Sequence, residues 1–206
     1  MAFAATDFDP NPILAIKDNA VLRDLLRAAT ADDHTLLDQA MAGLRLAEPD
    51  DLVQFLGIHL AARAGIESWL ADNAAPGWVP PAQTGLLAAD LVALGGLPAA
   101  FPAPRFVPGE EADWLGPAYV IAGSHLGNRL LLAQAGPAQA GPALAEDARG
   151  FLVGSAMHDY WRRLRTLLSG TPGPDGGAAA VRGAQATFAH FTCCVDMFRL
   201  AKSAAA

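Results

Sequence analysis

The sequence is poor in cysteine and in long apolar runs, and each shortage excludes a class of protein. Its only cysteines, Cys193 and Cys194, are adjacent, so they support neither a disulfide framework nor a spaced set of zinc ligands. We predict that both are core thiols rather than a redox pair. No apolar run is long enough to cross a bilayer, and the opening MAFAATDFDPNP carries acids where a secretory signal carries Lys or Arg. We therefore expect a cytoplasmic protein with no membrane partner.

Positive charge and sheet-forming residues are also scarce. The formal net charge is −7, and no basic run of the kind that follows a phosphate backbone is present, so we expect no nucleic-acid partner. The 52% apolar content comes mainly from Ala and Leu, which is typical of packed helices. The sequence predicts an all-α, single-domain protein over residues 19–206. Residues 1–18 hold two prolines and no period, which favours an N-terminal arm that is open to disorder.

Hydrophobic spacing and helix breakers predict roughly six or seven helices. Residues 18–46 have apolar positions at helical spacing, which indicates one long helix or two joined end to end. The other helices are expected over residues 52–73, 82–94, 109–135, 146–169 and 175–202. Gly116-Pro117 should interrupt the helix of residues 109–135 near its start.

His34 is the first candidate for a functional residue. Arg27 lies seven residues before it and Asp38 four after, so a helix places all three on nearly the same face. A neutral imidazole can bind a metal through one nitrogen while a carboxylate one turn away holds the other. The spacing therefore fits a metal ligand. Taken alone, a helical histidine is more often a surface or partly buried residue.

Two glycines make a second candidate. Gly123 and Gly127 are four residues apart and share one helical face, at a cost of roughly 1 kcal/mol each relative to Ala. Ser124 and Asn128 flank that face, whereas His125 points away and is a poor metal ligand. Such a bare face either admits a flat ligand or seats a neighbouring helix. His59, His158 and His190 stand on apolar backgrounds and are interpreted as packed or rim residues.

These two motifs resemble the haem oxygenase family, especially the bacterial type associated with phytochromes. The family's proximal motif, Arg-x-Ala-Thr-x-x-x-His-x-x-Leu-Asp, is similar to the segment from Arg27 to Asp38, with a one-residue register difference among the small residues. Its distal motif, Tyr-Val-x-x-Gly-Ser-x-Leu-Gly-Gly, resembles the segment that begins at Tyr119, with Asn128 in place of the last glycine. The resemblance extends in order from about residue 20 to residue 200.

The resemblance implies a helical bundle with haem b between a proximal helix carrying His34 and a kinked distal helix. Haem would be both cofactor and substrate, opened by O₂ to biliverdin, CO and ferrous iron, with electrons from an external ferredoxin or flavoprotein reductase. A bacteriophytochrome is one candidate to receive the biliverdin. The implied roles are His34 as metal ligand, with Asp38 beside it; Arg27, Tyr119 and Arg162 as haem contacts; and Gly123, Ser124, Gly127 and Asn128 over the oxygen site.

Two other functions stay open from the residues. The first is a non-catalytic haem carrier or sensor, because the Asn128 side chain either donates a hydrogen bond in the distal pocket or narrows it. The second is an unrelated helical enzyme such as a di-iron oxidase, which would need inward Glu-x-x-His pairs that the sequence lacks.

Overall fold

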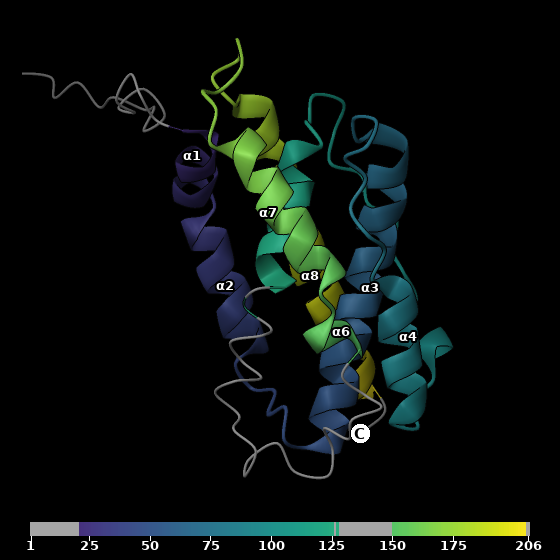
Figure 1. The fold of residues 1–206 in the computed structure, drawn as a ribbon. Coiled ribbons are helices and arrows are strands. Elements are labelled where there is room, and N and C mark those ends of the chain that lie inside the picture. Colours follow the sequence, from purple (N-terminus) through teal and green to yellow (C-terminus); the bar gives the residue numbers. More distant parts are fainter. Residues whose placement is uncertain (1–20, 126, 128–149, 205–206) are drawn as a thin grey trace, which may run out of the picture.

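The structure is a computed structural model that describes residues 21–125, 127 and 150–204. All regular secondary structure in these ranges is helical, as expected. Figure 1 shows α1 and α2 at one edge of the bundle, with α7 and α8 between them and α3. None of the described helices is both long and apolar enough to cross a membrane. The predicted arm of residues 1–18 lies outside the described residues.

The segment predicted as one or two helices is two. α1 spans Leu22–Ala29 and α2 spans Ala31–Met41. At the junction, the Thr30 hydroxyl donates a hydrogen bond of 2.8 Å to the Leu26 carbonyl, and its backbone leaves helical geometry with φ −114° and ψ 12°. A threonine bonded back to the preceding turn bends a helix, and here it separates two.

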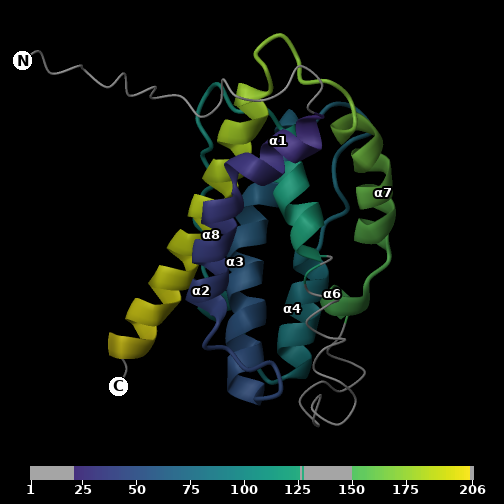
Figure 2. The same ribbon diagram turned by 90° about the vertical axis from the view of Figure 1, so that its left-hand side faces the viewer.

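α3, Pro49–Asn73, is the central helix. Pro49 can start the helix because the first turn needs no hydrogen bond from its missing N–H. The negative charges of Asp50 and Asp51 in the same turn stabilise the helix by their attraction to the positive end of its dipole. α4, Thr84–Ala93, packs along it, and a short 3₁₀ turn, η2, follows at Pro98–Ala100. Figure 2 shows α3 behind α1 and α2, with α8 and α7 on either side.

The helix expected from residue 109 starts later, so this prediction was wrong at its beginning. Gly109 has a φ of +94° in a turn, and the helix begins at residue 115 and is described to residue 125. Asp113 accepts a hydrogen bond of 2.7 Å from the Leu115 amide at this end. Pro117 therefore falls in the first turn, where it is tolerated, and does not interrupt the helix. Residues 128–135 lie outside the described residues.

The last predicted helices also needed correction. The single helix expected over residues 146–169 is two, α6 at Gly150–Val153 and α7 at Ala156–Leu168, separated by Gly154 and Ser155. α8, Ala178–Ala204, begins where Asp175 accepts hydrogen bonds from the Gly177 and Ala179 amides. These bonds satisfy donors that the first turn of a helix leaves free.

The core lies where α3, α8, α7, α1 and the helix of residues 115–125 meet. Glycine allows close approach at two of these contacts. A Cβ on Gly183 of α8 would lie 2.6 Å from the Asp113 carbonyl oxygen, and one on Gly65 of α3 would lie 2.6 Å from that of Pro104. No side chain fits at such distances, so backbone packs directly against backbone.

Candidate functional site

His34 lies on an open face of α2. Its side chain is 64% exposed, and α2 has no buried residue at all. The His34 Nδ1 lies 2.9 Å from the Asp38 Oδ2, as the spacing predicted. The ring also meets Phe188 of α8 edge-on, with 5.9 Å between centroids. Together these contacts orient the imidazole, and its Nε2 has no hydrogen bond to any described residue. A histidine held through one nitrogen with the other free is the arrangement of a metal ligand.

The two predicted glycines are open. A Cβ on Gly123 or on Gly127 would meet no described atom within 4 Å. This differs from Gly65 and Gly183, where backbone from another element fills the space. Helix packing among the described residues therefore does not explain Gly123 and Gly127. Tyr119 lies four residues before Gly123, so one helical face runs from Tyr119 to the glycines, and we call it the glycine face.

Ser124 turns away from the glycine face. Its hydroxyl accepts a hydrogen bond of 3.0 Å from Arg63 of α3 and donates one of 3.0 Å to the Ile121 carbonyl. Ser124 thus contacts the interior of the bundle rather than the open side. Asn128, the other predicted flanking residue, lies outside the described residues.

Arg27 and Tyr119 come together at one end of the glycine face. Burial raises the pKa of the Tyr119 phenol, and the positive charges of Arg27 and Arg23 oppose that rise. The Tyr119 ring lies 6.1 Å from that of Trp161 on α7. Arg23 pairs with Asp24, whereas Arg27 is exposed and forms no ion pair with any described residue. Arg27 is thus a cation available to an anionic ligand beside a half-buried tyrosine.

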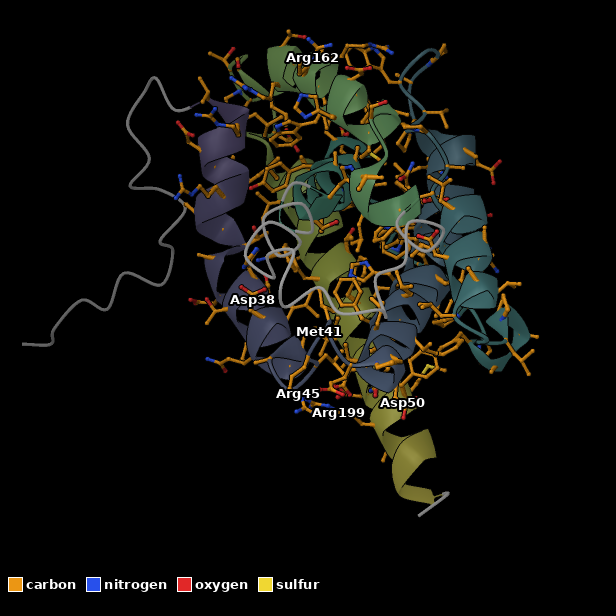
Figure 3. The ribbon with its side chains drawn as sticks, turned by 60° about the horizontal axis from the view of Figure 1, so that its bottom comes forward. Asp38, Met41, Arg45, Asp50, Arg162 and Arg199 are labelled. Atoms are coloured by element: carbon orange, nitrogen blue, oxygen red, sulfur yellow. The ribbon has the colours of Figure 1, made fainter. Side chains whose placement is uncertain are left out.

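Arg162 is engaged elsewhere. Its guanidinium lies 2.7 Å from the Asp159 carboxylate, and its side chain is 67% exposed. Figure 3 shows Arg162 on α7 and Asp38 on α2 well separated from one another. Arg165 lies one turn after Trp161 on the same face of α7, is exposed, and forms no ion pair with a described residue. Arg165 is therefore better placed than Arg162 to accompany Arg27 and Tyr119.

The other histidines are packed, in agreement with the interpretation from sequence. His59 is buried among Phe55, Phe151 and Phe191, and burial, aided by the charge of Arg63, lowers its pKa to about 3. His125 is fully buried and its Nε2 lies 2.9 Å from the Gly154 carbonyl oxygen. Neither is available as a ligand on the glycine face.

One prediction about the cysteines was wrong. Cys194 is buried, and burial raises the pKa of its thiol to about 12, but Cys193 is exposed. Adjacent residues of a helix point about 100° apart, so both cannot face the same core. Cys193 instead lines an apolar groove between α2 and α8 with Leu36 and Met197.

Arg63 did not emerge from the sequence motifs, and Arg165 belonged to a local cluster of positive charge at residues 161–165 in which only Arg162 was given a role. The available signal for Arg63 was Glu67 four residues later in an otherwise apolar helix, since a buried arginine needs a partner. The signal for Arg165 was its spacing from Trp161. Both are weak, because such spacings also occur on solvated faces.

Comparisons with known proteins identify the family of the chain. No family model matches the chain. It is 34% identical over 154 residues to a protein of Xanthomonas campestris pv. campestris (strain 8004) named heme oxygenase, and the match covers 72% of this chain and 90% of that protein. The fold is similar to a crystal structure of the NO- and CO-bound heme oxygenase from Neisseria meningitidis, with a TM-score of 0.67 and 20% identity. That match covers 85% of this chain and 90% of the other.

The structural likeness confirms the expected all-helical fold. The sequence relative extends over most of its own length, so it bears on the whole helical region rather than on one motif. The sequence relative favours an enzyme that degrades haem over a non-catalytic carrier. The chain belongs to the haem oxygenase family.

Proposed function

We propose that this enzyme opens haem to biliverdin, CO and ferrous iron between α2 and the glycine face, where His34 would hold the iron. The observation that carries the proposal is the exposed His34, whose Nδ1 is held by Asp38 and whose Nε2 is free, together with two glycines that pack against nothing described. In Figure 1 the helix of residues 115–125 appears next to α2, and in Figure 2 it stands on the other side of α3 from α2. A planar ligand between these two helices would cover the exposed face of α2.

His34 would bind the iron through Nε2. Asp38 would keep the proton on Nδ1 and hold the ring in place, which also increases the electron donation of the imidazole. Gly123 and Gly127 would let the macrocycle approach the backbone more closely than any side chain allows. When bound, haem supplies the redox chemistry with O₂ and is itself the molecule that is opened.

Arg27 and Tyr119 would anchor the haem carboxylates. A guanidinium matches a carboxylate with two parallel hydrogen bonds, and Arg27 has no competing ion pair among the described residues. Arg162, the second arginine predicted from the sequence, would first have to leave Asp159, so we add Arg165 as a further contact. Such anchors fix the in-plane orientation of the macrocycle and hence the carbon bridge that is attacked.

The reaction consumes electrons, so the proposal includes a donor outside this chain. A ferredoxin or a flavoprotein reductase is the class that the family resemblance implies. A bacteriophytochrome is the corresponding candidate to receive the biliverdin. Both are tested by adding each protein to the haem complex and following electron transfer or biliverdin uptake.

The decisive test is His34→Ala. The substitution should abolish biliverdin formation with ascorbate as reductant, because no other described histidine is placed to ligate the iron. An exposed residue contributes little to folding, so the free energy of unfolding of the haem-free protein should change by less than about 0.5 kcal/mol. The absorption spectrum of the haem complex and the biliverdin yield are the measurements, and added imidazole should restore part of the spectrum.

Asp38→Asn and His158→Ala sharpen this test. Loss of the carboxylate should weaken haem binding by roughly 10-fold to 100-fold, as for other groups that orient a metal-bound histidine. His158→Ala removes a histidine of α7 and should leave the haem spectrum unchanged. A wild-type spectrum and yield in His34→Ala would disprove the assignment of the ligand.

A further inference from the structure

Arg63 is a fully buried arginine behind the glycine face. Its side chain has no solvent exposure, and burial lowers the pKa of its guanidinium to about 10, an effect that Glu67 opposes. A charge is costly to remove from water unless hydrogen bonds and an opposite charge compensate it. The contacts of Arg63 therefore indicate what this charge holds.

Its strongest contacts are with the helix that carries the glycine face. The Arg63 Nη2 donates to the Ile121 carbonyl at 2.8 Å and to the Ser124 hydroxyl at 3.0 Å. The Ser124 hydroxyl donates in turn to the same Ile121 carbonyl at 3.0 Å. The three groups form a closed set of hydrogen bonds around the turn that contains Gly123.

This turn lacks side-chain support on its other side. Gly123 has no side chain, and a Cβ there would meet no described atom within 4 Å. Glycine also allows more backbone conformations than any other residue. Among the described residues, the position of this turn therefore depends on contacts from behind, which Arg63 and Ser124 provide.

Arg63 is itself fixed by two other elements. Its Nη1 lies 3.8 Å from a Glu67 oxygen, and the Glu67 carboxylate accepts hydrogen bonds from the Gln83 and Thr84 amides at the start of α4. Its guanidinium lies 5.1 Å from the centroid of the Phe151 ring on α6. The guanidinium thus connects the Gly123 turn to α4 and α6.

We infer that Arg63, acting through Ser124 and the Ile121 carbonyl, is a positioning residue that sets where the glycine face stands over the haem. The inference rests on the proposed function for its effect on haem, but not for its effect on the helix. A shift of this helix changes how bound haem and O₂ meet the backbone, so it changes which carbon bridge reacts. Arg63 therefore determines regiochemistry without touching the reacting atoms.

The test compares Arg63→Met with Arg63→Lys, Ser124→Ala and the matched control Arg163→Met. Arg163 also donates to a carbonyl, that of Gly77, at 2.8 Å, and its guanidinium also lies 5.1 Å from an aromatic centroid, that of Trp78. Both of these partners belong to the segment between α3 and α4 and not to the helix of residues 115–125. Two quantities are measured for each variant. The first is amide hydrogen exchange in the haem-free protein, and the second is the ratio of biliverdin isomers formed by the haem complex.

We expect Arg63→Met to speed exchange at residues 121–125 by about tenfold or more relative to residues 156–168 of α7, as in a local opening. The isomer ratio should change with it. Lysine keeps one donor and should restore part of both effects, Ser124→Ala should show smaller changes in the same direction, and Arg163→Met should show neither.

Uniformly faster exchange in all helices, or an unchanged isomer ratio in the folded fraction, would overturn the inference and leave Arg63 as a structural residue only. If Arg63→Met does not fold, Arg63→Lys and Ser124→Ala are judged by the same two criteria. The exchange result needs no haem, so a failure of the proposed haem chemistry would be visible separately.

Discussion

α1 and α2 follow each other directly in the chain, yet they stand in opposite environments. α1 buries Leu22, Leu25 and Leu26, whereas α2 buries nothing and leaves Leu36 60% exposed. α8 holds the chain on both sides of α2, because Gln185 donates to the carbonyl of Ala29, the last residue of α1, and Arg199 donates to that of Ala40 near the end of α2. Figure 3 labels Arg199 near the C-terminal end of α2. A helix fixed at its ends with an open face is suited to receive a ligand.

Glycines in the other helices also fall into a closely packed kind and an unpacked kind. Gly65 and Gly183 let backbones touch, while a side chain at Gly123 or Gly127 would meet no atom of the residues that the structure describes. The two kinds of glycine cannot be separated by spacing, because each simply lacks a side chain. We call the buried core, with Gly65 and Gly183, the packed half of the molecule, because it stabilises the fold. We call α2 and the glycine face the open half, which we assign to haem.

The largest expected difference between the two halves is in the free energy of unfolding that is lost when a leucine is replaced by alanine. Leu26→Ala should lower the free energy of unfolding of the haem-free protein by about 2–5 kcal/mol, because Leu26 is fully buried and the change leaves a cavity. Leu36→Ala on α2 should change it by less than about 0.5 kcal/mol. Urea denaturation measures both, and a similar loss for the two variants would break the comparison.

The next effect is the loss of unfolding free energy at low pH that is caused by His59 in the packed half. His59 has a pKa of about 3 in the folded protein and an ordinary value of 6.5, so between these values the unfolded chain binds a proton that the folded protein does not. Its contribution to stability is complete above about pH 6.5 and is lost as the pH falls toward 3. From pH 7 to pH 5 the loss should be about 2 kcal/mol.

His59→Leu should remove that part of the pH dependence, measured as unfolding free energies at pH 7 and pH 5. His34→Leu, which removes a histidine from the open half, is the control and should retain it. An equal pH slope in wild type and His59→Leu would show that His59 is not the group responsible.

The smallest effect has opposite signs in the two halves. Gly183→Ala should destabilise the haem-free protein by about 1–3 kcal/mol, because its Cβ would overlap the Asp113 carbonyl. Gly123→Ala should stabilise it by up to about 1 kcal/mol, since alanine is the better helix former and has room. The same Gly123→Ala should slow biliverdin formation per bound haem. Thermal unfolding and turnover on one sample test this, and destabilisation by Gly123→Ala would show that its face is packed.

Much of the fold was predictable because it depends on local spacing. The apolar period and the breakers located the helices, and their errors occurred where one residue acts against the pattern, as Pro117 and Gly154 do. The His34 and Asp38 pair was predictable for the same reason, since residues four apart on a helix are neighbours whatever surrounds them. The spacing of Gly123 and Gly127 fitted either a ligand site or a contact with another helix, and only the structure showed that no described residue packs there.

The sequence by itself determined the helical class, the contact between His34 and Asp38 on α2 and the positions of the glycines, because a 3.6-residue period acts within one segment. Only the tertiary structure decided which arginine is buried and which cysteine is exposed, whereas the pairing of Arg162 with Asp159, three residues before it on α7, is local. Arg63 obtains its environment from Ile121, Ser124 and Phe151, which lie far from it in the sequence, and Cys193 is exposed because of the way α8 is rotated against its neighbours. Such rotation depends on packing among all the helices, so no local pattern contains it.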